Sequence, residues 1–130
     1  MDIGHQQQTK QFNLSEAQEL LPLLKHITVA AAEDLLEVEH KLQRLLLADL
    51  RRQHYQARYK TIITRWKTKM ESLGLVVESL WKIKFDVGDG YLCWQHPDLS
   101  INAYLDKSEA WEKRLPIKTI IEEFDPDWAY

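Results

Sequence analysis

The fold is decided by residues 12–45, which read FNLSEAQELLPLLKHITVAAAEDLLEVEHKLQRL. Apolar side chains in this stretch recur at heptad spacing, which is typical of a helix that buries one stripe against a partner. The first row is Leu14, Leu21, Thr28, Leu35 and Leu42, and the second is Ala17, Leu24, Ala31, Val38 and Leu45. Thr28 is the only polar member of either row. The pattern therefore predicts one long amphipathic helix from Leu14 to about Leu50.

The start of this helix carries its own signals. Asn13 is a residue type favoured at helix N-caps, and Glu16 three residues later completes a capping box. Pro22 removes one helical hydrogen bond, but the heptad rows continue in phase beyond it, so we expect a kink and not an end. Residues 1–11 have no apolar periodicity and are predicted to form a disordered tail.

A second helix is predicted after the polar residues 51–54. Apolar and aromatic side chains from Tyr55 to Leu73 follow at spacings of three and four, and Gly74 stands where a left-handed C-cap residue is expected. The two helices should form an antiparallel hairpin. The second is about half as long as the first, so it covers only residues 32–50 of its partner.

The period changes from 3.6 to 2 after Gly74. Trp81, Ile83, Phe85 and Val87 alternate with charged residues, which predicts a half-buried strand. Residues 91–95 and 99–105 read as two further strands, and residues 76–80 extend the first strand or add a short one.

The chain ends with weaker signals. Pro116 is suited to the first turn of a short helix that contains Ile117, Ile120, Ile121 and Phe124. The sequence thus predicts an α+β fold, a long antiparallel helical hairpin packed against a small three-stranded antiparallel β-meander, with a short C-terminal helix. Residues 12–124 form the single domain, and residues 125–130 are expected to be loose.

The first half of the long helix has a wider apolar arc than the short helix can cover. Leu20, Leu23, Ile27 and Ala30 widen it to about half of the circumference. A leucine left in water forgoes roughly 1.5–3 kcal/mol, so the arc needs cover. The sheet provides it in one interpretation, and a second copy of the chain covers the remainder in the other. Leu20, Leu23 and Ile27 are therefore candidate self-association residues.

Composition limits the classes of protein. The chain has 130 residues, a net charge of -3 and one cysteine, which cannot form an internal disulfide. No apolar run approaches the roughly 20 residues of a membrane span, and the first ten residues lack the apolar segment of a signal peptide. We expect a cytoplasmic protein that does not bind membranes. The net charge makes no global case for nucleic acid.

The local charge is more informative. Between residues 51 and 69 there are seven basic residues and no acid: Arg51, Arg52, Arg58, Lys60, Arg65, Lys67 and Lys69. Tyr55, Tyr59 and Trp66 are interleaved with them, and basic side chains beside aromatic rings can bind phosphates and stack on bases. The basic helix could also complement Glu33, Glu37 and Glu39 on its hairpin partner, or an acidic patch on another subunit of a homo-oligomer or on a protein partner.

The common catalytic motifs are absent. The sequence has no C-x-x-C, no phosphate-binding loop, no G-x-S-x-G and no H-E-x-x-H, so no metal or cofactor is predicted and catalysis is disfavoured. One set of side chains could still line a pocket between the sheet and the long helix: Cys93, Trp94, His96, Tyr104 and Arg114. Cys93 itself fits a structural role, because no base is placed beside it.

Two segments carry a family resemblance. FNLSEA at residues 12–17 with LLPLL at residues 20–24, and GDGYLCW at residues 88–94, resemble the opening and the D-G-x-x-x-Y-L-C-W segment of the prokaryotic domain-of-unknown-function 2203 family. RLPI at residues 114–117 is similar to the closing motif of that family. Tyr104, Leu105 and Asp106 stand where the family usually has Tyr-Trp-His, so no role of that histidine carries over. The family has no assigned activity, and the resemblance implies a fold and a bacterial cytoplasmic setting.

The sequence leaves three functions open. The first is a non-catalytic protein-interaction or self-assembly module. The second is a nucleic-acid-binding protein that uses the basic helix 51–69. The third is a small-ligand binder or enzyme with a pocket between the sheet and the first helix.

Overall fold

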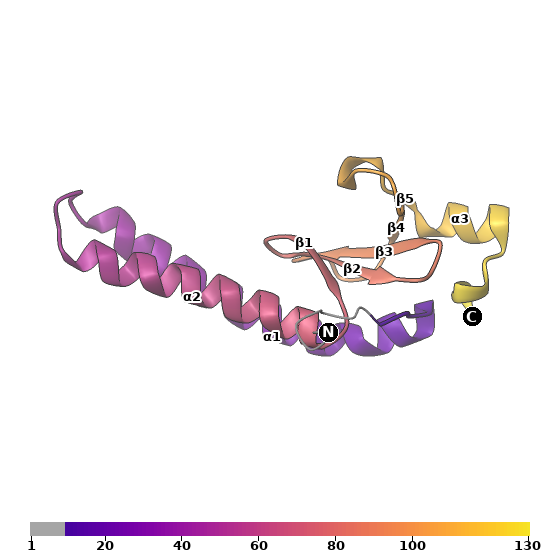
Figure 1. Cartoon of the computed structure of the whole chain (residues 1–130), viewed down its shortest axis with the longest axis horizontal. Helices are drawn as coiled ribbons and strands as arrows, with labels where there is room; N and C mark the ends of the chain where they lie inside the picture. The colour runs from indigo at the N-terminus through magenta and orange to yellow at the C-terminus, as the bar shows by residue number, and fades with distance from the viewer. Residues whose placement is uncertain (1–9) are drawn as a thin grey trace, which may run out of the picture.

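The computed structural model describes residues 10–130 (Figure 1). The tail predicted over residues 1–11 lies outside the described residues, apart from its last two. The Lys10 backbone N–H donates to the Gly74 carbonyl at 3.0 Å, and Gln11 forms a parallel bridge with Asp86. Residues 10 and 11 are therefore part of the folded domain.

The first helix, α1 (Leu14–Arg44), begins as predicted. The Asn13 side chain accepts from the Glu16 backbone N–H at 2.8 Å, and the Glu16 carboxylate accepts from the Asn13 backbone N–H at 3.0 Å. The helix continues through Pro22. Its buried residues all belong to the two heptad rows: Ala17, Leu21, Leu24, Thr28, Leu35 and Val38.

The end of α1 differs from the prediction. The helix stops at Arg44, and residues 45–50 form the loop to α2 (Arg51–Ser72). The Arg52 guanidinium donates to the Leu42 carbonyl at 2.8 Å, which satisfies one of the free carbonyls at the end of α1. The Asp49 carboxylate accepts from the Arg51 backbone N–H at 2.9 Å and so satisfies one of the free N–H groups at the start of α2.

The second helix is longer than predicted. It has 22 residues against 31 in α1, and it begins four residues before Tyr55. It therefore reaches past residue 32 of its partner: the Trp66 indole N–H donates to the Thr28 hydroxyl at 2.9 Å. Gly74, at φ +89°, ends the hairpin as predicted.

The sheet has five strands and not the three expected. They are β1 (Val76–Ser79), β2 (Lys82–Asp86), β3 (Gly90–Gln95), β4 (Ala103–Asp106) and β5 (Leu115–Pro116). The strands pair antiparallel in the order β1-β2-β3-β4-β5. Residues 76–79 form a strand of their own, because a two-residue turn separates them from β2. Residues 99–102, expected in a strand, are irregular.

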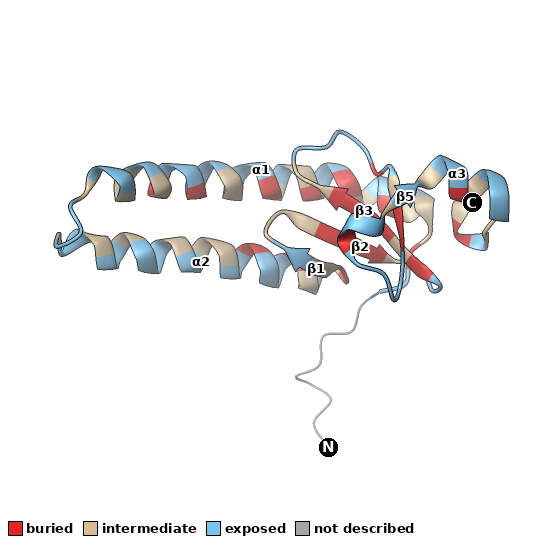
Figure 2. Cartoon of the chain, turned by 90° about the horizontal axis from the view of Figure 1, so that it is seen from above, coloured by how far each residue is buried: buried red, intermediate tan, exposed pale blue. Residues whose placement is uncertain are grey.

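One face of the sheet packs on the hairpin and forms the main core. Ile83, Phe85, Leu92, Trp94 and Tyr104 point to this face and are buried together with Leu21, Leu24 and Met70. The sheet covers only the part of the hairpin near the N-terminus of α1 (Figures 1 and 2). The other half of the hairpin projects beyond the sheet as a two-helix arm.

The chain ends in α3 (Ile117–Phe124), which begins after Pro116 as predicted. The last residues are not loose. Asp127–Ala129 form a 3₁₀ turn, and the buried Trp128 ring stacks on Tyr104 with 5.5 Å between ring centroids. Residues 125–130 are ordered because an aromatic ring four residues beyond Phe124 finds its partner on β4, a contact that local sequence does not indicate. None of the helices from Lys10 onward combines the length and hydropathy needed to cross a bilayer.

Candidate functional site

The free end of the helical arm presents three leucines to solvent. Leu46, Leu47 and Leu50 are 82%, 90% and 86% exposed. They lie in the loop that joins α1 to α2, at the end of the molecule farthest from α3 (Figure 1). Single exposed leucines are common on protein surfaces, but adjacent ones at a projecting end make a candidate interaction surface. We call Leu46, Leu47 and Leu50 the leucine tip.

The loop that carries the leucine tip is fixed by its own hydrogen bonds. The Asp49 backbone N–H donates to the Leu46 carbonyl at 3.0 Å, and the Arg52 backbone N–H donates to the Asp49 carbonyl at 3.1 Å. The Arg51 guanidinium contacts the Asp49 carboxylate at 2.8 Å, and these hydrogen bonds lower the pKa of Asp49 to about 2. These bonds hold the loop in place with the three leucines on its outside.

The surroundings of the leucine tip are basic. Residues 41–60 contain six Lys or Arg residues and a single acid, Asp49, so their formal net charge is +5. Asp49 is already paired with Arg51. The tip is thus an apolar surface with a positive rim.

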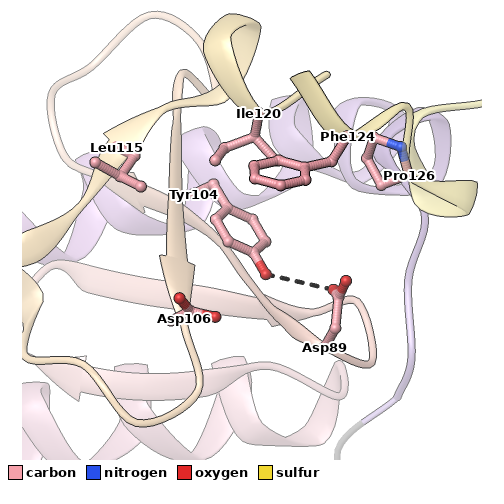
Figure 3. Close-up of a pocket in the computed structure, with 7 residues that line it drawn as sticks. All are labelled: Asp89, Tyr104, Asp106, Leu115, Ile120, Phe124 and Pro126. Carbon is pink, nitrogen blue, oxygen red and sulfur yellow. Dashed lines mark hydrogen bonds between the residues drawn. The ribbon is translucent and has the colours of Figure 1, made fainter. Parts of the chain in front are cut away.

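A pocket lies at the opposite end of the molecule, between the sheet and α3 (Figure 3). It has a volume of about 380 Å³. Its lining consists of Asp89, Tyr104, Asp106, Leu115, Ile120, Phe124 and Pro126. Phe124 and Leu115 are 68% and 48% exposed, so the walls remain open to solvent. We call this the α3 pocket.

Tyr104 forms the floor of the α3 pocket. Its hydroxyl lies 3.4 Å from an Asp89 carboxylate oxygen, the contact drawn in Figure 3. Burial, followed by the charges of Asp89 and Asp106, raises the pKa of Tyr104 to about 12. The phenol therefore stays protonated and acts as a hydrogen-bond donor. The α3 pocket combines apolar walls with two carboxylates at its edge, which suits a partner that is both apolar and cationic.

The five residues proposed to line a pocket between the sheet and α1 are distributed over both faces of the sheet. Cys93 and Arg114 lie on the face away from α1, where Trp111 covers Cys93. The Arg114 guanidinium stacks on the Trp111 ring at 4.4 Å, and its Nε donates to the Trp111 carbonyl at 2.9 Å. Burial raises the pKa of the Cys93 thiol to about 12, which is unsuited to a nucleophile.

The other three lie toward the hairpin but at different places. Trp94 is buried, and its indole N–H donates to the Asp98 carbonyl at 2.8 Å. His96 packs near Trp94, with 6.4 Å between the ring centroids. Tyr104 is the only one of the five that lines the α3 pocket. The structure thus brings together Cys93 with Arg114, and Trp94 with His96, but not all five.

The basic residues of α2 form two rows. Arg51, Arg58, Arg65 and Lys69 follow one side of the helix at spacings of seven and four, whereas Lys60 and Lys67 lie across the apolar seam from them and Arg52 lies in the seam. Arg52 binds the end of α1, and Arg51 binds Asp49. Trp66, a proposed stacking residue, is 2% exposed and bonded to Thr28, so no base can stack on it.

The proposed self-association residues on α1 are partly covered. Leu20 and Ile27 are half-buried against the main core, and Leu23 is 45% exposed. Ala30 is exposed as well, so the residues that widen the apolar arc of α1 are only partly covered within the chain. From Lys10 onward, no three His, Cys, Asp or Glu side chains lie close enough together to hold a metal ion.

The leucine tip was missed at the sequence level. The heptad rows end with Leu42 and Leu45, and Leu46 and Leu47 fall outside both rows. Apolar residues that leave the phase of a helix indicate either a change of partner or exposure, but a helix predicted to reach about Leu50 includes these leucines.

Comparison with known proteins agrees with the motifs at both ends of the domain. No curated protein and no solved structure matches the chain. The model of one family, described as "Uncharacterized conserved protein (DUF2203)", matches residues 10–117. That range includes both helices of the hairpin and all five strands. The chain therefore belongs to the DUF2203 family of uncharacterized conserved proteins.

Proposed function

We propose that the chain is a non-catalytic protein-interaction module that docks through the leucine tip of its helical arm. The observation that carries the proposal is the exposure of Leu46, Leu47 and Leu50, each above 80%, on a loop held by its own hydrogen bonds. Burying a leucine is worth roughly 1.5–3 kcal/mol, and none of this is gained within the chain. Docking of the leucines on a partner surface would provide this stabilisation.

The arm itself supports this function. Half of the hairpin extends beyond the sheet, so the domain body does not obstruct a partner that approaches the tip (Figure 2). The packing of Thr28 with Trp66 and of Leu35 and Val38 in the seam keeps the two helices together. A rigid arm positions its end at little entropic cost on binding.

The two other functions have less support. The proposed ligand residues are distributed over both faces of the sheet, and the thiol of Cys93 is covered by Trp111. The basic residues of α2 lie on both sides of the apolar seam; Trp66 is buried in the seam, and Tyr55 and Tyr59 are half-buried. Arg51, Arg58, Arg65 and Lys69 share one side of α2, but Arg51 is paired with Asp49 and the Trp66 ring is buried, so nucleic-acid binding has less support than docking through the leucine tip.

A photo-crosslinking experiment tests the proposal. The photoreactive residue p-benzoylphenylalanine is placed at Leu47, and at Thr64 as a control, because Thr64 is exposed on α2 away from the tip. Irradiation in the native host should give a discrete protein adduct from position 47 and none from position 64. The adduct should be lost when Leu46 and Leu50 are changed to serine. Equal adducts from both positions, or none from position 47, would contradict the proposed function.

A further inference from the structure

The leucine tip and the α3 pocket are two open apolar surfaces at opposite ends of the molecule (Figure 1). The tip is a convex loop end, and the pocket is a hollow with a volume of about 380 Å³. Within residues 10–130, no other apolar segment covers the leucine tip or fills the α3 pocket. Their shapes are suited to each other, since one projects and the other recedes.

The charges of the two surfaces are opposite. The leucine tip lies in a stretch with six basic residues and one acid. The α3 pocket has Asp89 and Asp106 at its edge, and neither makes an ion pair within the described part of the chain. Residues 117–127, which form the outer wall, contain Glu122, Glu123, Asp125 and Asp127 against the single base Lys118.

The charges also decide among the ways in which two copies could meet. Two tips in contact would bring two stretches of formal charge +5 together, and two pockets in contact would place carboxylates against carboxylates. Only the pairing of a tip with a pocket buries apolar surface on both sides and joins opposite charges.

We propose that the leucine tip of one copy docks into the α3 pocket of a second copy. This inference rests on the proposed function and names a second copy of the chain as the partner. The leucines would contact Phe124, Leu115 and Ile120, and the basic side chains beside the tip would face Asp89 and Asp106. Because the donor and acceptor surfaces lie at opposite ends, the contact is heterologous, and it extends head to tail unless the chain of copies closes on itself.

The expected association is weak and salt-sensitive. One loop end in one pocket buries less than the roughly 1,200 Å² at the lower limit of stable interfaces, so the complex should be transient. Exposed charges at its rim are screened within about 10 Å at 0.1 M salt. Added salt should therefore reduce the association.

Sedimentation velocity with two complementary variants tests the proposal. The tip variant carries L46S, L47S and L50S, and the pocket variant carries L115S and F124S; all five positions are exposed, so both variants should fold. The wild-type chain should sediment faster as its concentration rises toward about 1 mM, and each variant alone should remain a monomer. L99S is the matched control, because Leu99 is 85% exposed and lies in neither surface; this variant should associate like the wild type.

The mixture of the two variants provides the sharpest readout. The intact pocket of the tip variant can accept the intact tip of the pocket variant, but no further copy can join. An equimolar mixture should therefore form a heterodimer and nothing larger. A mixture that stays monomeric, or a tip variant that associates like the wild type, would overturn the proposal.

The outcomes separate this inference from the proposed function. A monomeric wild-type chain whose position 47 still crosslinks to another protein would overturn the inference and leave the proposed function intact. The wild-type chain could also stay monomeric while its tip binds vesicles of anionic phosphatidylglycerol and the tip variant does not. That result would assign the tip to a lipid surface and overturn the inference as well. Adducts of the chain with itself, together with heterodimer formation, would support both.

Discussion

The indole N–H of Trp66 donates a hydrogen bond of 2.9 Å to the hydroxyl of Thr28, and both side chains are buried between α1 and α2. Thr28 is the one polar residue in the two heptad rows of α1. Its position in the seam follows from a partner 38 residues away in the sequence. The bond satisfies a donor and a hydroxyl that would otherwise be buried without partners.

Replacing Thr28 with valine should lower the free energy of unfolding by about 1–3 kcal/mol. Valine has a similar shape but cannot accept the bond, so the buried Trp66 N–H is left without a partner. Thr28→Ser keeps the hydroxyl and should cost less than Thr28→Val. Urea denaturation followed by tryptophan fluorescence measures both. A valine variant as stable as the wild type would show that the bond contributes no net stability.

This pair illustrates what the sequence could predict of the hairpin. Local spacing was enough for the buried stripe of α1, because helical periodicity depends only on neighbours within a few turns. The role of Thr28 and the length of α2 were not predictable in this way. The start of α2 depends on the Asp49 carboxylate and on Arg52, which bonds to a carbonyl ten residues away. These contacts form only once both helices are present.

The leucine tip should contribute almost nothing to stability. Serine at positions 46, 47 and 50 should change the free energy of unfolding by less than about 0.5 kcal/mol per site, because these side chains are already in water. Leu24→Ala is the contrast, since Leu24 is fully buried, and should cost about 2–5 kcal/mol. Urea midpoints of the two variants compare them directly. A large loss in the triple serine variant would mean that the leucines pack within the chain.

Gly90 should not tolerate a side chain. A Cβ at this position would overlap the Tyr104 hydroxyl and lie 2.7 Å from the Leu105 carbonyl oxygen, which belongs to the neighbouring strand. Gly90→Ala should therefore displace the Tyr104 ring and cost about 1–3 kcal/mol, although alanine is ordinarily better than glycine in a strand.

The control for Gly90 is Asp106→Ala, because Asp106 is exposed and pairs with Gly90 across the strands. It should be close to neutral in stability. Near-ultraviolet circular dichroism reports the Tyr104–Trp128 stack, and its signal should fall in Gly90→Ala alone. An unchanged spectrum and midpoint in that variant would refute the close packing of Gly90 on Tyr104.

The sheet and the α3 pocket show the limits of local patterns. Alternation predicted β2 and β3, but β5 has two residues, too few for any periodicity. The α3 pocket is assembled from a turn, two strands, α3 and the segment after it. The sequence groups Tyr104 with four residues that do not line this pocket. Only the strand register, which places Tyr104 opposite Leu92 and its hydroxyl over Gly90, brings it beside Asp89.

Cys93 should make stability depend on pH in the alkaline range. Burial raises the pKa of its thiol from 9.0 to about 12 in the folded chain. Between these two values the unfolded chain releases the thiol proton and the folded chain keeps it. The unfolded state therefore binds fewer protons, and the free energy of unfolding falls as pH rises, by up to about 1.4 kcal/mol per pH unit from this group. The stability that the buried neutral thiol contributes to the folded chain is fully present below pH 9 and is lost as the pH rises toward 12.

Comparison with Cys93→Ala isolates the thiol. Tyr104, whose pKa is also raised to about 12, titrates in both chains, so the difference between their slopes belongs to Cys93. Urea unfolding at pH values from about 8 to about 11 should give a steeper decline for the wild type than for Cys93→Ala. The alanine variant also loses packing beneath Trp111, but that loss shifts its curve by a constant and leaves the slope unchanged. Parallel curves would mean that the thiol ionises equally in both states and that Trp111 does not exclude water from it.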